Sequence, residues 1–399
     1  SSSSPFISER PIDQPRPLKL IYIGAGISGI VAAIQFLKAV PHLELTIYEK
    51  NPELGGTWFE NRYPGCACDV PSHTYQLSSE SWTEWSHFFS GSEEILEYWK
   101  RVAQKYNVRK HILFNRRCVE ARWHDTTSSW TVQVQDVLTE NIFEDSADVL
   151  MIGTGLLNEW KWPSVSGLQS FKGQLLHSAS WDESFDLRGK NIAVIGSGST
   201  AVQIVPAIID KVKSMDHYVH GKHRPVDAII CATGFEKNLG GNFPIIGCGG
   251  SSLRDRYANR PETYLGLCTD GFPNFFQSLG PNSFQGAGNL LIMIEHTHAY
   301  VAQILSRMAY GNVGQVEPKR RQVLNFTNYA EKYFERTVYS SECNSWYKSP
   351  PPGATTLQQR KKGRVTALWP GSSLHAIKAL EHVRWEDFET TAYDGNEFG

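Results

Sequence analysis

Residues 24–29 read Gly-Ala-Gly-Ile-Ser-Gly, and this glycine-rich run constrains the fold more than any other part of the chain. A predicted strand, 18–24, leads into it, and residues 30–40 follow with helical periodicity. The next predicted strand, 43–48, ends at Glu49, 20 residues beyond the last glycine, which is the spacing of an acid that binds a ribose hydroxyl. This strand–turn–helix–strand unit predicts a dinucleotide site. The alternative is a glycine-rich turn without a ligand.

Each glycine of this turn has its own role in such a site. Gly24 allows the tight turn, Gly26 lets a pyrophosphate approach the backbone, and Gly29 lets the helix pack closely on the strand. The helix N-terminus adds backbone amides and a partial positive charge, which together favour a phosphate.

Composition limits the class of protein. The chain has 399 residues, enough for two or three domains, and a formal net charge of −2 from 39 basic and 41 acidic residues. This balance argues against a nucleic-acid-binding surface, and no apolar run reaches the roughly 18 residues of a membrane span. The seven cysteines include no C-x-x-C pair, so we expect unpaired thiols, no metal site and a cytoplasmic protein. Residues 1–17 are expected to form a disordered leader without a secretory signal, and no feature indicates an oligomeric state.

A second glycine pair lies just beyond the predicted ribose-binding strand. It lies within the aromatic-rich segment 51–71, and loops of this length without secondary structure are usually functional. The alternative is merely a long, aromatic-rich loop. The motifs G-G-T-W and N-x-Y-P-G, followed by Asp69 and Tyr75, resemble the FAD-binding half of the class B flavoprotein monooxygenases, specifically the Baeyer–Villiger monooxygenases.

The resemblance implies which residues hold FAD. The residues expected at the ADP half are Gly24, Gly26, Ser28, Gly29 and Glu49. The residues expected near the ribityl chain or the isoalloxazine are Gly56, Thr57, Trp58, Asp69 and Tyr75. Leu290, near the start of a predicted helix that begins about Gly288, matches a position whose backbone contacts flavin in relatives.

A more specific resemblance lies further along the chain. Phe171, Gly173, His177, Trp181 and Asp182 match the family fingerprint F-x-G-x-x-x-H-x-x-x-W-[P/D] at every defined position. Each residue alone has a structural explanation, as a core aromatic or a loop histidine. In the family this segment links the two nucleotide domains, so we assign no proton transfer to His177.

A second glycine-rich turn follows the predicted strand 190–195 and precedes the predicted helix 202–213. By resemblance, the residues that bind the nicotinamide dinucleotide here are Gly196, Ser197, Gly198, Ser199, Thr200 and Ala201. The next strand, around 215–219, ends without a carboxylate and is followed by Lys222 and two more basic residues, which favours NADP over NAD. The alternative is a basic cluster on the surface.

These units predict an α/β protein with two Rossmann-like dinucleotide-binding domains, one for FAD and one for NADP. The FAD domain is expected to be discontinuous, with its first part at 18–155 and its second part, with a C-terminal extension, at 227–399. Between them, 156–226 would form the NADP-binding domain.

Spacing indicates that the NADP-binding domain is shortened. Fewer than 40 residues separate Gly196 from the matching Ala-Thr-Gly at 232–234, too few for a complete mononucleotide-binding half. Relatives place here the rest of that domain, a helical segment over the substrate, and an arginine over the flavin. Two explanations stay open: the printed sequence omits an internal segment of a longer protein, or the protein itself is shortened.

The resemblance implies an FAD- and NADPH-dependent Baeyer–Villiger monooxygenase, which inserts one oxygen atom of O2 into a small-molecule ketone through a C4a-peroxyflavin and yields an ester or lactone. Asp69 matches the family's aspartate that orients the flavin-facing arginine, and is the one catalytic residue that we expect. The alternatives are an N- or S-oxygenating flavin monooxygenase and a flavin-binding protein without turnover. No residue identifies the ketone, and a bulky secondary metabolite stays open.

Overall fold

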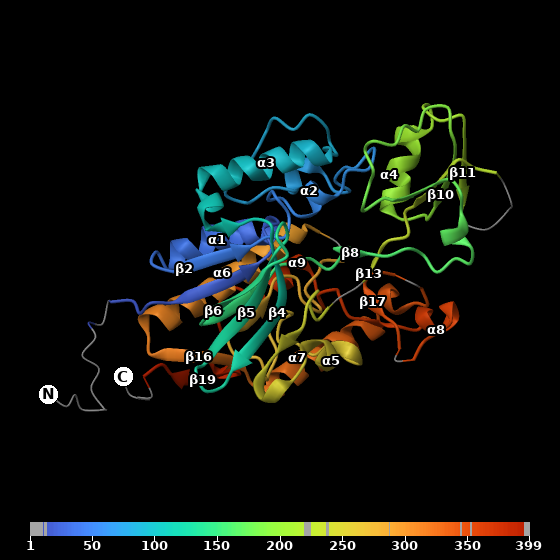
Figure 1. The fold of residues 1–399 in the computed structure, drawn as a ribbon. Helices are drawn as coiled ribbons and strands as arrows, with labels where there is room; N and C mark the ends of the chain where they lie inside the picture. The colour runs from blue at the N-terminus through green and yellow to red at the C-terminus, as the bar shows by residue number, and fades with distance from the viewer. Residues whose placement is uncertain are drawn as a thin grey trace. The chain divides into compact units, whose positions relative to one another are not determined.

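The computed structural model describes residues 11, 14–218, 225–236, 239–286, 288–343, 345–351 and 353–394. The chain divides into two compact units, which are described separately (Figure 1). The first unit combines Ser1–Leu54, Ala103–Leu156 and Asn238–Gly399, and the second combines Gly55–Val102 and Leu157–Lys237.

A parallel sheet of five strands, in the order β15-β7-β1-β2-β3, forms the centre of the first unit. The strands are β1 (Lys19–Ile23), β2 (Glu44–Tyr48), β3 (Ile112–Leu113), β7 (Val149–Ile152) and β15 (Phe275–Gln277). The two strands predicted on either side of the first glycine-rich turn are confirmed as β1 and β2, which pair in parallel. Most residues of β1, β2 and β7 are aliphatic and buried, as expected when both faces of a sheet are covered.

Two helices, α1 (Ile27–Ala39) and α6 (Leu290–Tyr310), pack against each other in the first unit. The ring of Phe36 on α1 lies 5.6 Å from that of His298 on α6. Helix α1 begins three residues earlier than predicted, because the glycine-rich run itself forms its first turn. The helix predicted near Gly288 is confirmed as α6, which begins after the Asn289 cap.

An antiparallel sheet packs against the parallel sheet through a shared hydrophobic core. It consists of β4 (Arg116–His124), β5 (Ser129–Asp136) and β6 (Ile142–Ala147), with β14 (Ile245–Ile246) parallel to β4. Ile21 and Ile23 of β1 face this core together with Trp130 and Phe275. Because strand side chains alternate, Tyr22 points the other way, toward α6.

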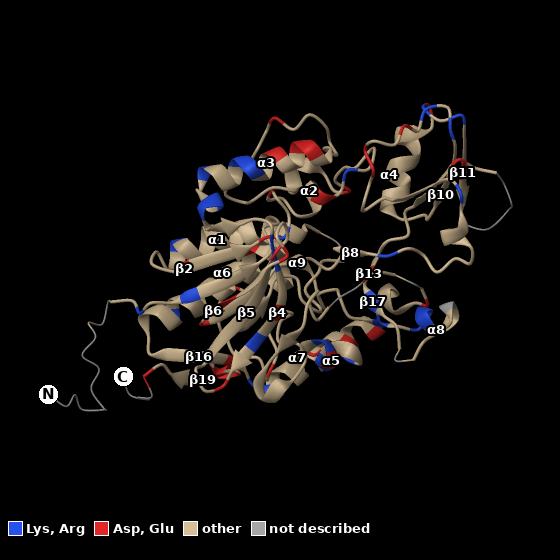
Figure 2. Ribbon diagram, viewed as in Figure 1, with Lys and Arg blue, Asp and Glu red and all other residues tan. Residues whose placement is uncertain are grey.

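The C-terminal part of the first unit adds small elements around this core. They are α5 (Leu253–Ala258), β16 (Val313–Pro318), α7 (Arg320–Glu335), β17 (Lys348–Ser349), α8 (Leu357–Lys361), β18 (Arg364–Val365), α9 (Ser373–Ala379) and β19 (Phe388–Ala392). Charges of both signs gather along α5 and α7 (Figure 2). There the buried Glu262 carboxylate pairs with Arg256, Arg260 and Arg320, which joins the two helices.

The second unit contains a parallel sheet in the order β11-β10-β12-β9. Its strands are β9 (Gln174–His177), β10 (Asn191–Ile195), β11 (Ser214–Tyr218) and β12 (Ala228–Cys231), and α4 (Ser199–Ile208) packs on it. The other α-helices and strands that begin in this unit are α2 (Thr57–Glu60), α3 (Ser92–Lys105), β8 (Glu159–Trp160) and β13 (Phe235–Glu236). Helix α4 ends at Ile208, not at 213 as predicted, because the Lys213 amide donates to the Lys190 carbonyl and returns the chain to the start of β10.

Strand β12 lies between β10 and β9, so the second sheet continues past residue 226, where the sequence placed the return to the flavin-binding part. Nine residues, 219–227, join β11 to β12. Parallel strands are usually joined by a dozen or more residues with a helix. Between β10 and β12, the described residues therefore contain one helix, α4.

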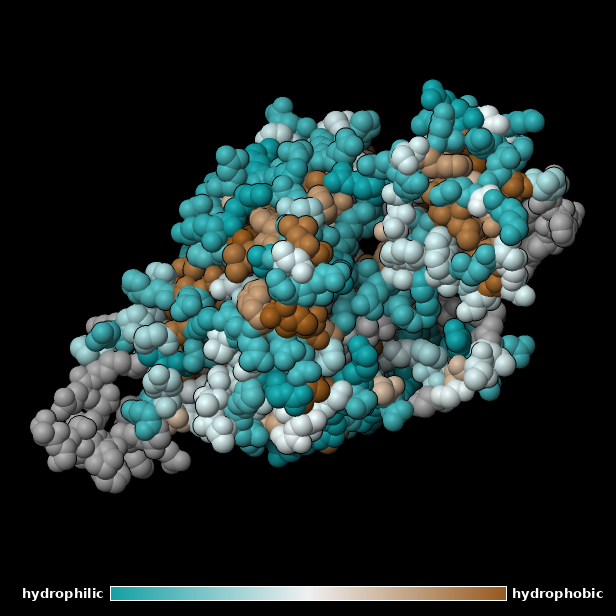
Figure 3. All heavy atoms as spheres, in the orientation of Figure 1, coloured by the Kyte–Doolittle hydropathy of each residue, from teal (hydrophilic) through white to brown (hydrophobic). Residues whose placement is uncertain are grey.

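Hydrophilic residues dominate the face in Figure 3, and hydrophobic ones form scattered patches there. In the part of the chain that the structure describes, no helix combines the length and the apolar character needed to cross a membrane.

Candidate functional site

The first glycine-rich turn is tightly packed. Gly24 has φ +107°, and its amide donates to the Tyr48 carbonyl (2.8 Å). A Cβ at Gly24 would lie 2.8 Å from the Gly153 carbonyl oxygen, and a Cβ at Gly29 would lie 2.2 Å from the Gly24 carbonyl oxygen. The turn therefore requires glycine at both positions, as predicted.

The N-terminus of α1 has backbone amides that no side chain caps. Its N-cap is Gly26, no side chain caps it, and its first turn contains no acidic residue. By contrast, side chains of Ser252, Asn289 and Ser372 cap α5, α6 and α9. The amides of the first turn of α1, with the positive end of the helix dipole, fit the pyrophosphate of a dinucleotide.

Glu49 directly follows β2, and its carboxylate is buried and held by the backbone. Oε2 accepts from the Ala25 amide (2.7 Å), and Oε1 accepts from the Asn51 amide (2.9 Å). The structure thus brings the predicted ribose-binding acid to the glycine-rich turn at the carboxyl ends of β1 and β2, where ligands of parallel sheets bind.

A buried polar network lies beneath this turn. The Tyr22 hydroxyl is 3.0 Å from Nε2 of His298, and Nδ1 of His298 is 2.7 Å from the Ile294 carbonyl oxygen. Because a carbonyl can only accept, Nδ1 carries the proton of the neutral imidazole, and Nε2 accepts from Tyr22. Burial lowers the pKa of His298 to about 4, against the opposing effect of the Ile294 carbonyl. The imidazole is therefore neutral near pH 7.

The network extends into the first turn of α1. The Ser278 hydroxyl donates to the Ser28 oxygen (2.9 Å), which leaves the Ser28 hydroxyl to donate to the Tyr22 oxygen. Burial raises the pKa of that phenol. The sequence predicted Ser28 but missed its partners, although a tyrosine in the middle of an aliphatic strand was a usable signal.

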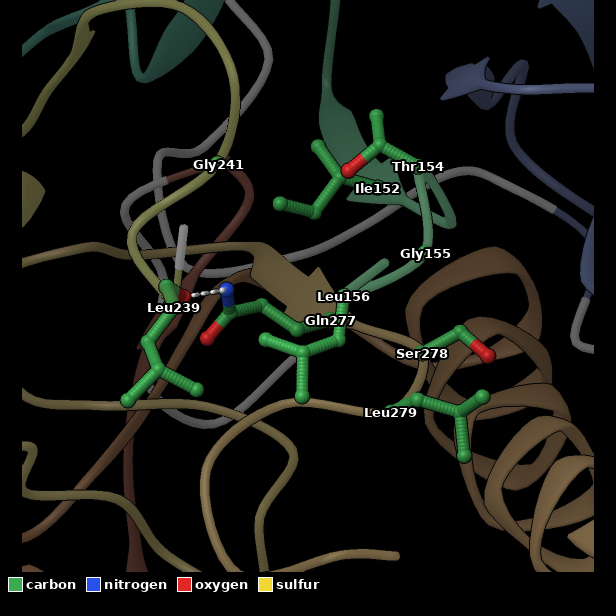
Figure 4. A pocket seen from close by; sticks show the side chains of 9 residues that line it. All are labelled: Ile152, Thr154, Gly155, Leu156, Leu239, Gly241, Gln277, Ser278 and Leu279. Atoms are coloured by element: carbon green, nitrogen blue, oxygen red, sulfur yellow. Dashed lines mark hydrogen bonds between the residues drawn. The ribbon is translucent and has the colours of Figure 1, made fainter. Parts of the chain in front are cut away.

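A small pocket opens beside this network at the ends of β7 and β15. It encloses about 290 Å³ including the solvent at its mouth. Its lining residues are Ile152, Thr154, Gly155, Leu156, Leu239, Gly241, Gln277, Ser278 and Leu279 (Figure 4). The Gln277 amide donates to the Leu239 carbonyl (3.2 Å), which joins two sides of the pocket. Leu290, the first residue of α6, is half-buried and packs on a cluster that includes Leu156.

Two aromatic residues of the predicted flavin end meet in the second unit. Gly56 precedes α2 with φ 53°, and Thr57 and Trp58 begin that helix. The Trp58 indole donates to the Tyr75 hydroxyl (3.3 Å), and the two rings lie 5.4 Å apart, edge to face. Asp69 is exposed, and no cation among the described residues forms an ion pair with it.

The second glycine-rich turn resembles the first in its geometry. Gly196 has φ +125°, and a Cβ there would lie 2.2 Å from the Ala232 carbonyl oxygen. Gly198 begins α4 without a side-chain cap or an acidic residue in the first turn. Ser197 and Ser199 are exposed, Thr200 is half-buried, and the buried Ala201 packs into the core of the sheet. Lys222 lies outside the described residues.

The fingerprint residues lie along the second sheet. Gly173 is needed for close approach, because a Cβ would lie 2.2 Å from the Asp227 carbonyl oxygen. His177 ends β9, stacks on Trp160 (4.5 Å between ring centroids) and accepts from the Ala179 amide. Burial lowers its pKa to about 4, which suits a packed neutral ring.

The remaining fingerprint residues have local roles. Trp181 packs against the core under α4, and Phe171 is half-buried beside Gly173. The Asp182 carboxylate accepts from the amide and hydroxyl of Ser184, so it caps a turn.

Known proteins resemble the chain along nearly its whole length. Residues 18–215 match the family model of flavin-binding monooxygenase-like proteins. The FAD-binding monooxygenase tazF of Aspergillus terreus is 29% identical over 96% of this chain and 91% of its own length. A Baeyer–Villiger monooxygenase of Pseudomonas aeruginosa is 27% identical over 95% of this chain and 91% of its own length. The chain is a flavin-dependent monooxygenase, and its relatives include enzymes of the Baeyer–Villiger type.

Solved structures share the fold of this monooxygenase. The closed crystal structure of cyclohexanone monooxygenase matches with a TM-score of 0.81 at 18% identity, over 95% of this chain and 100% of that one. The structure of OTEMO in complex with FAD and NADP matches with a TM-score of 0.81 at 22% identity, over the same shares. The predicted α/β fold with two Rossmann-like domains is confirmed.

The alignment with the Aspergillus terreus relative is longer than this chain. It spans 520 positions against 399 residues here, so the relative has at least 121 residues without a counterpart in this monooxygenase.

Proposed function

We propose that this monooxygenase binds FAD at the turn after β1 and NADPH at the turn after β10, and that it inserts one oxygen atom of O2 into a ketone to give an ester or lactone. One observation carries the proposal. Each glycine-rich turn ends in a helix N-terminus without a side-chain cap, at the carboxyl end of a strand in a parallel sheet.

The residues that would hold the ADP half of FAD fit that group. Amides of α1 face the pyrophosphate position, where Gly26 leaves the backbone accessible, and the fixed Glu49 carboxylate can accept from ribose hydroxyls. When bound, FAD supplies the hydride acceptor and the centre that reacts with O2. Trp58 and Tyr75 would form an apolar wall that excludes water at the reactive end.

The nicotinamide dinucleotide would lie on the turn that begins at Gly196, with its pyrophosphate at the N-terminus of α4. The preference for NADPH rests on Lys222 and the neighbouring basic residues, since no carboxylate follows β11 in the sequence.

Asp69 would hold and orient a cation at the flavin end of the site. A preorganised cation stabilises negative charge that develops on the oxygen of the ketone. The printed sequence contains no residue that we match to the family's arginine, so the cation would come from an omitted internal segment or from another group.

A second candidate function follows from that missing partner. Asp69 has no ion-pair partner among the described residues, and the Aspergillus terreus relative carries at least 121 further residues. A protein that oxidises NADPH through bound flavin, without oxygenating a ketone, fits this observation.

A product assay with a ketone and a thioether in parallel separates the candidates. The proposed function gives ester or lactone from the ketone in step with NADPH oxidation. Sulfoxide alone identifies an S-oxygenating enzyme, and NADPH oxidation with only hydrogen peroxide as product supports the second candidate.

A further inference from the structure

The side-chain amide of Gln203 on α4 forms hydrogen bonds with the segment that precedes Asp69. The Tyr63 hydroxyl donates to Oε1 of Gln203 (2.8 Å), and Nε2 of Gln203 donates to the Ala67 carbonyl (2.9 Å). Both ends of one amide are used, so Gln203 fixes two points of the segment at once. Tyr63 also hydrogen-bonds the side chain of Thr200, in the second glycine-rich turn.

The backbone between these two points lies directly on the helix. Gly65 has φ +78°, and a Cβ there would lie 2.6 Å from the Gln203 carbonyl oxygen and 2.9 Å from Cβ of Ala207. The Tyr63 ring packs against the hydrophobic core beneath α4. Only glycine permits this approach, which brings the segment within reach of the Gln203 side chain.

The opposite edge of the segment is also held. The Ser92 amide donates to the Cys66 carbonyl and the Cys68 amide donates to the Ser90 carbonyl, each at 2.9 Å. These bonds form an antiparallel bridge just before α3. Residues 63–68 are therefore held between α4 and the start of α3, and Asp69 follows immediately.

We propose that Gln203 is a positioning residue that holds the Tyr63–Asp69 segment and the nicotinamide-binding turn in one fixed arrangement. The inference rests on the proposed function, because it places Asp69 at the flavin end and Thr200 at the nicotinamide end. Hydride transfer requires the donor and the acceptor to be held close together, and a misplacement of about 1 Å can slow a reaction by about a hundredfold. The Gln203 contacts remove one source of such misplacement.

The test compares Gln203→Ala and Tyr63→Phe with a matched control. Gln303→Ala in the first unit also removes an amide that joins two segments, since Gln303 donates to the Glu381 carbonyl and accepts from the Val383 amide. We expect Gln203→Ala to slow anaerobic reduction of bound flavin by NADPH on the order of tenfold, with FAD content unchanged. Tyr63→Phe should show a smaller effect in the same direction, and Gln303→Ala none. Reduction at the wild-type rate in Gln203→Ala overturns the proposal.

Amide hydrogen exchange gives a readout that does not depend on turnover. In Gln203→Ala, the Cys68 and Ser92 amides should exchange faster, and in Gln303→Ala they should not. Unchanged exchange in Gln203→Ala also overturns the proposal. If wild-type flavin is not reduced by NADPH, the proposed function fails, and exchange alone then decides whether Gln203 holds the segment.

Discussion

At the scale of single residues, one backbone carbonyl determines which groups donate and which accept in the hydrogen-bond network beneath the first glycine-rich turn. Because the Ile294 carbonyl can only accept, His298 must accept from Tyr22, and the Tyr22 oxygen is left to accept from Ser28. All the side chains of this network are buried, so each lost partner leaves an unpaired polar atom away from water. The network therefore connects the stability of α6 to the geometry of the turn that we assign to FAD.

Replacing Tyr22 with Phe removes the hydroxyl that joins these groups. Nε2 of His298 is then left without a donor in a buried site, so we expect the free energy of unfolding to fall by about 1–3 kcal/mol in urea titrations. Tyr329→Phe is the control, because Tyr329 is 44% exposed, and it should change stability by less than about 0.5 kcal/mol. Equal stability of Tyr22→Phe and the wild type would show that the network contributes nothing.

His298 also predicts a pH dependence of stability. Its pKa is about 4 in the folded chain against an ordinary value of 6.5, so between these values the unfolded chain binds a proton that the folded chain does not. Stability therefore falls as the pH drops from 6.5 toward 4. Urea titrations at each pH measure the free energy of unfolding. Between pH 7 and pH 4.5, this free energy should fall by roughly 2–3 kcal/mol more in the wild type than in His298→Phe. Parallel losses in the two proteins would contradict the assigned neutral state.

Glu49 tests the ribose-binding assignment. Glu49→Gln removes the negative charge while it keeps the size of the side chain, and charged hydrogen bonds contribute about 1.5–3 kcal/mol each. We expect FAD affinity to fall by about ten- to a hundredfold in equilibrium titrations of the apoprotein. Glu44→Gln, at the exposed start of the same strand, should bind FAD as the wild type does. A normal affinity in Glu49→Gln would remove Glu49 from the site.

Among the elements, those next to glycine were the most predictable. The turn before α1 could be placed because glycine spacing, strand and helix agree locally, and Gly24 and Gly29 meet backbone that no side chain could approach. The end of α4 could not be placed, because it depends on a bond between Lys213 and the distant start of β10. The position of β12 in the second sheet depends likewise on pairing between strands.

The second turn allows two glycine substitutions with different outcomes. A Cβ at Gly198 meets no atom within 4 Å, so Gly198→Ala should fold normally and yet obstruct a pyrophosphate at the N-terminus of α4. We expect weaker NADPH binding with unchanged FAD content, measured by fluorescence titration and by the flavin spectrum. Gly196→Ala should in addition lower the melting temperature, because of the clash with Ala232 and the positive φ. Unaltered NADPH affinity in Gly198→Ala would place the nicotinamide elsewhere.

At the scale of the whole molecule, the two cofactor-binding turns and the strands beside them could be predicted from sequence. Which segments of the chain form each compact unit could not. Residues 55–102 follow the first βαβ unit in sequence, yet they form one compact unit with 157–237. The contact between Tyr63 and Gln203, for example, joins residues that are 140 positions apart. No local sequence pattern predicts such a contact. The buried side-chain network around His298 escaped prediction for the same reason, because its partners come from β1, α1, the end of β15 and α6.

In the proposed function, this chain carries two dinucleotides and uses them to oxygenate a ketone. The most direct measurement supplies FAD-loaded protein with NADPH, a ketone and ¹⁸O2, and follows the product by mass spectrometry. We expect an ester or lactone that contains one ¹⁸O atom, formed in step with NADPH oxidation. A protein that binds FAD and consumes NADPH, but yields no labelled product from a broad panel of ketones, would contradict it.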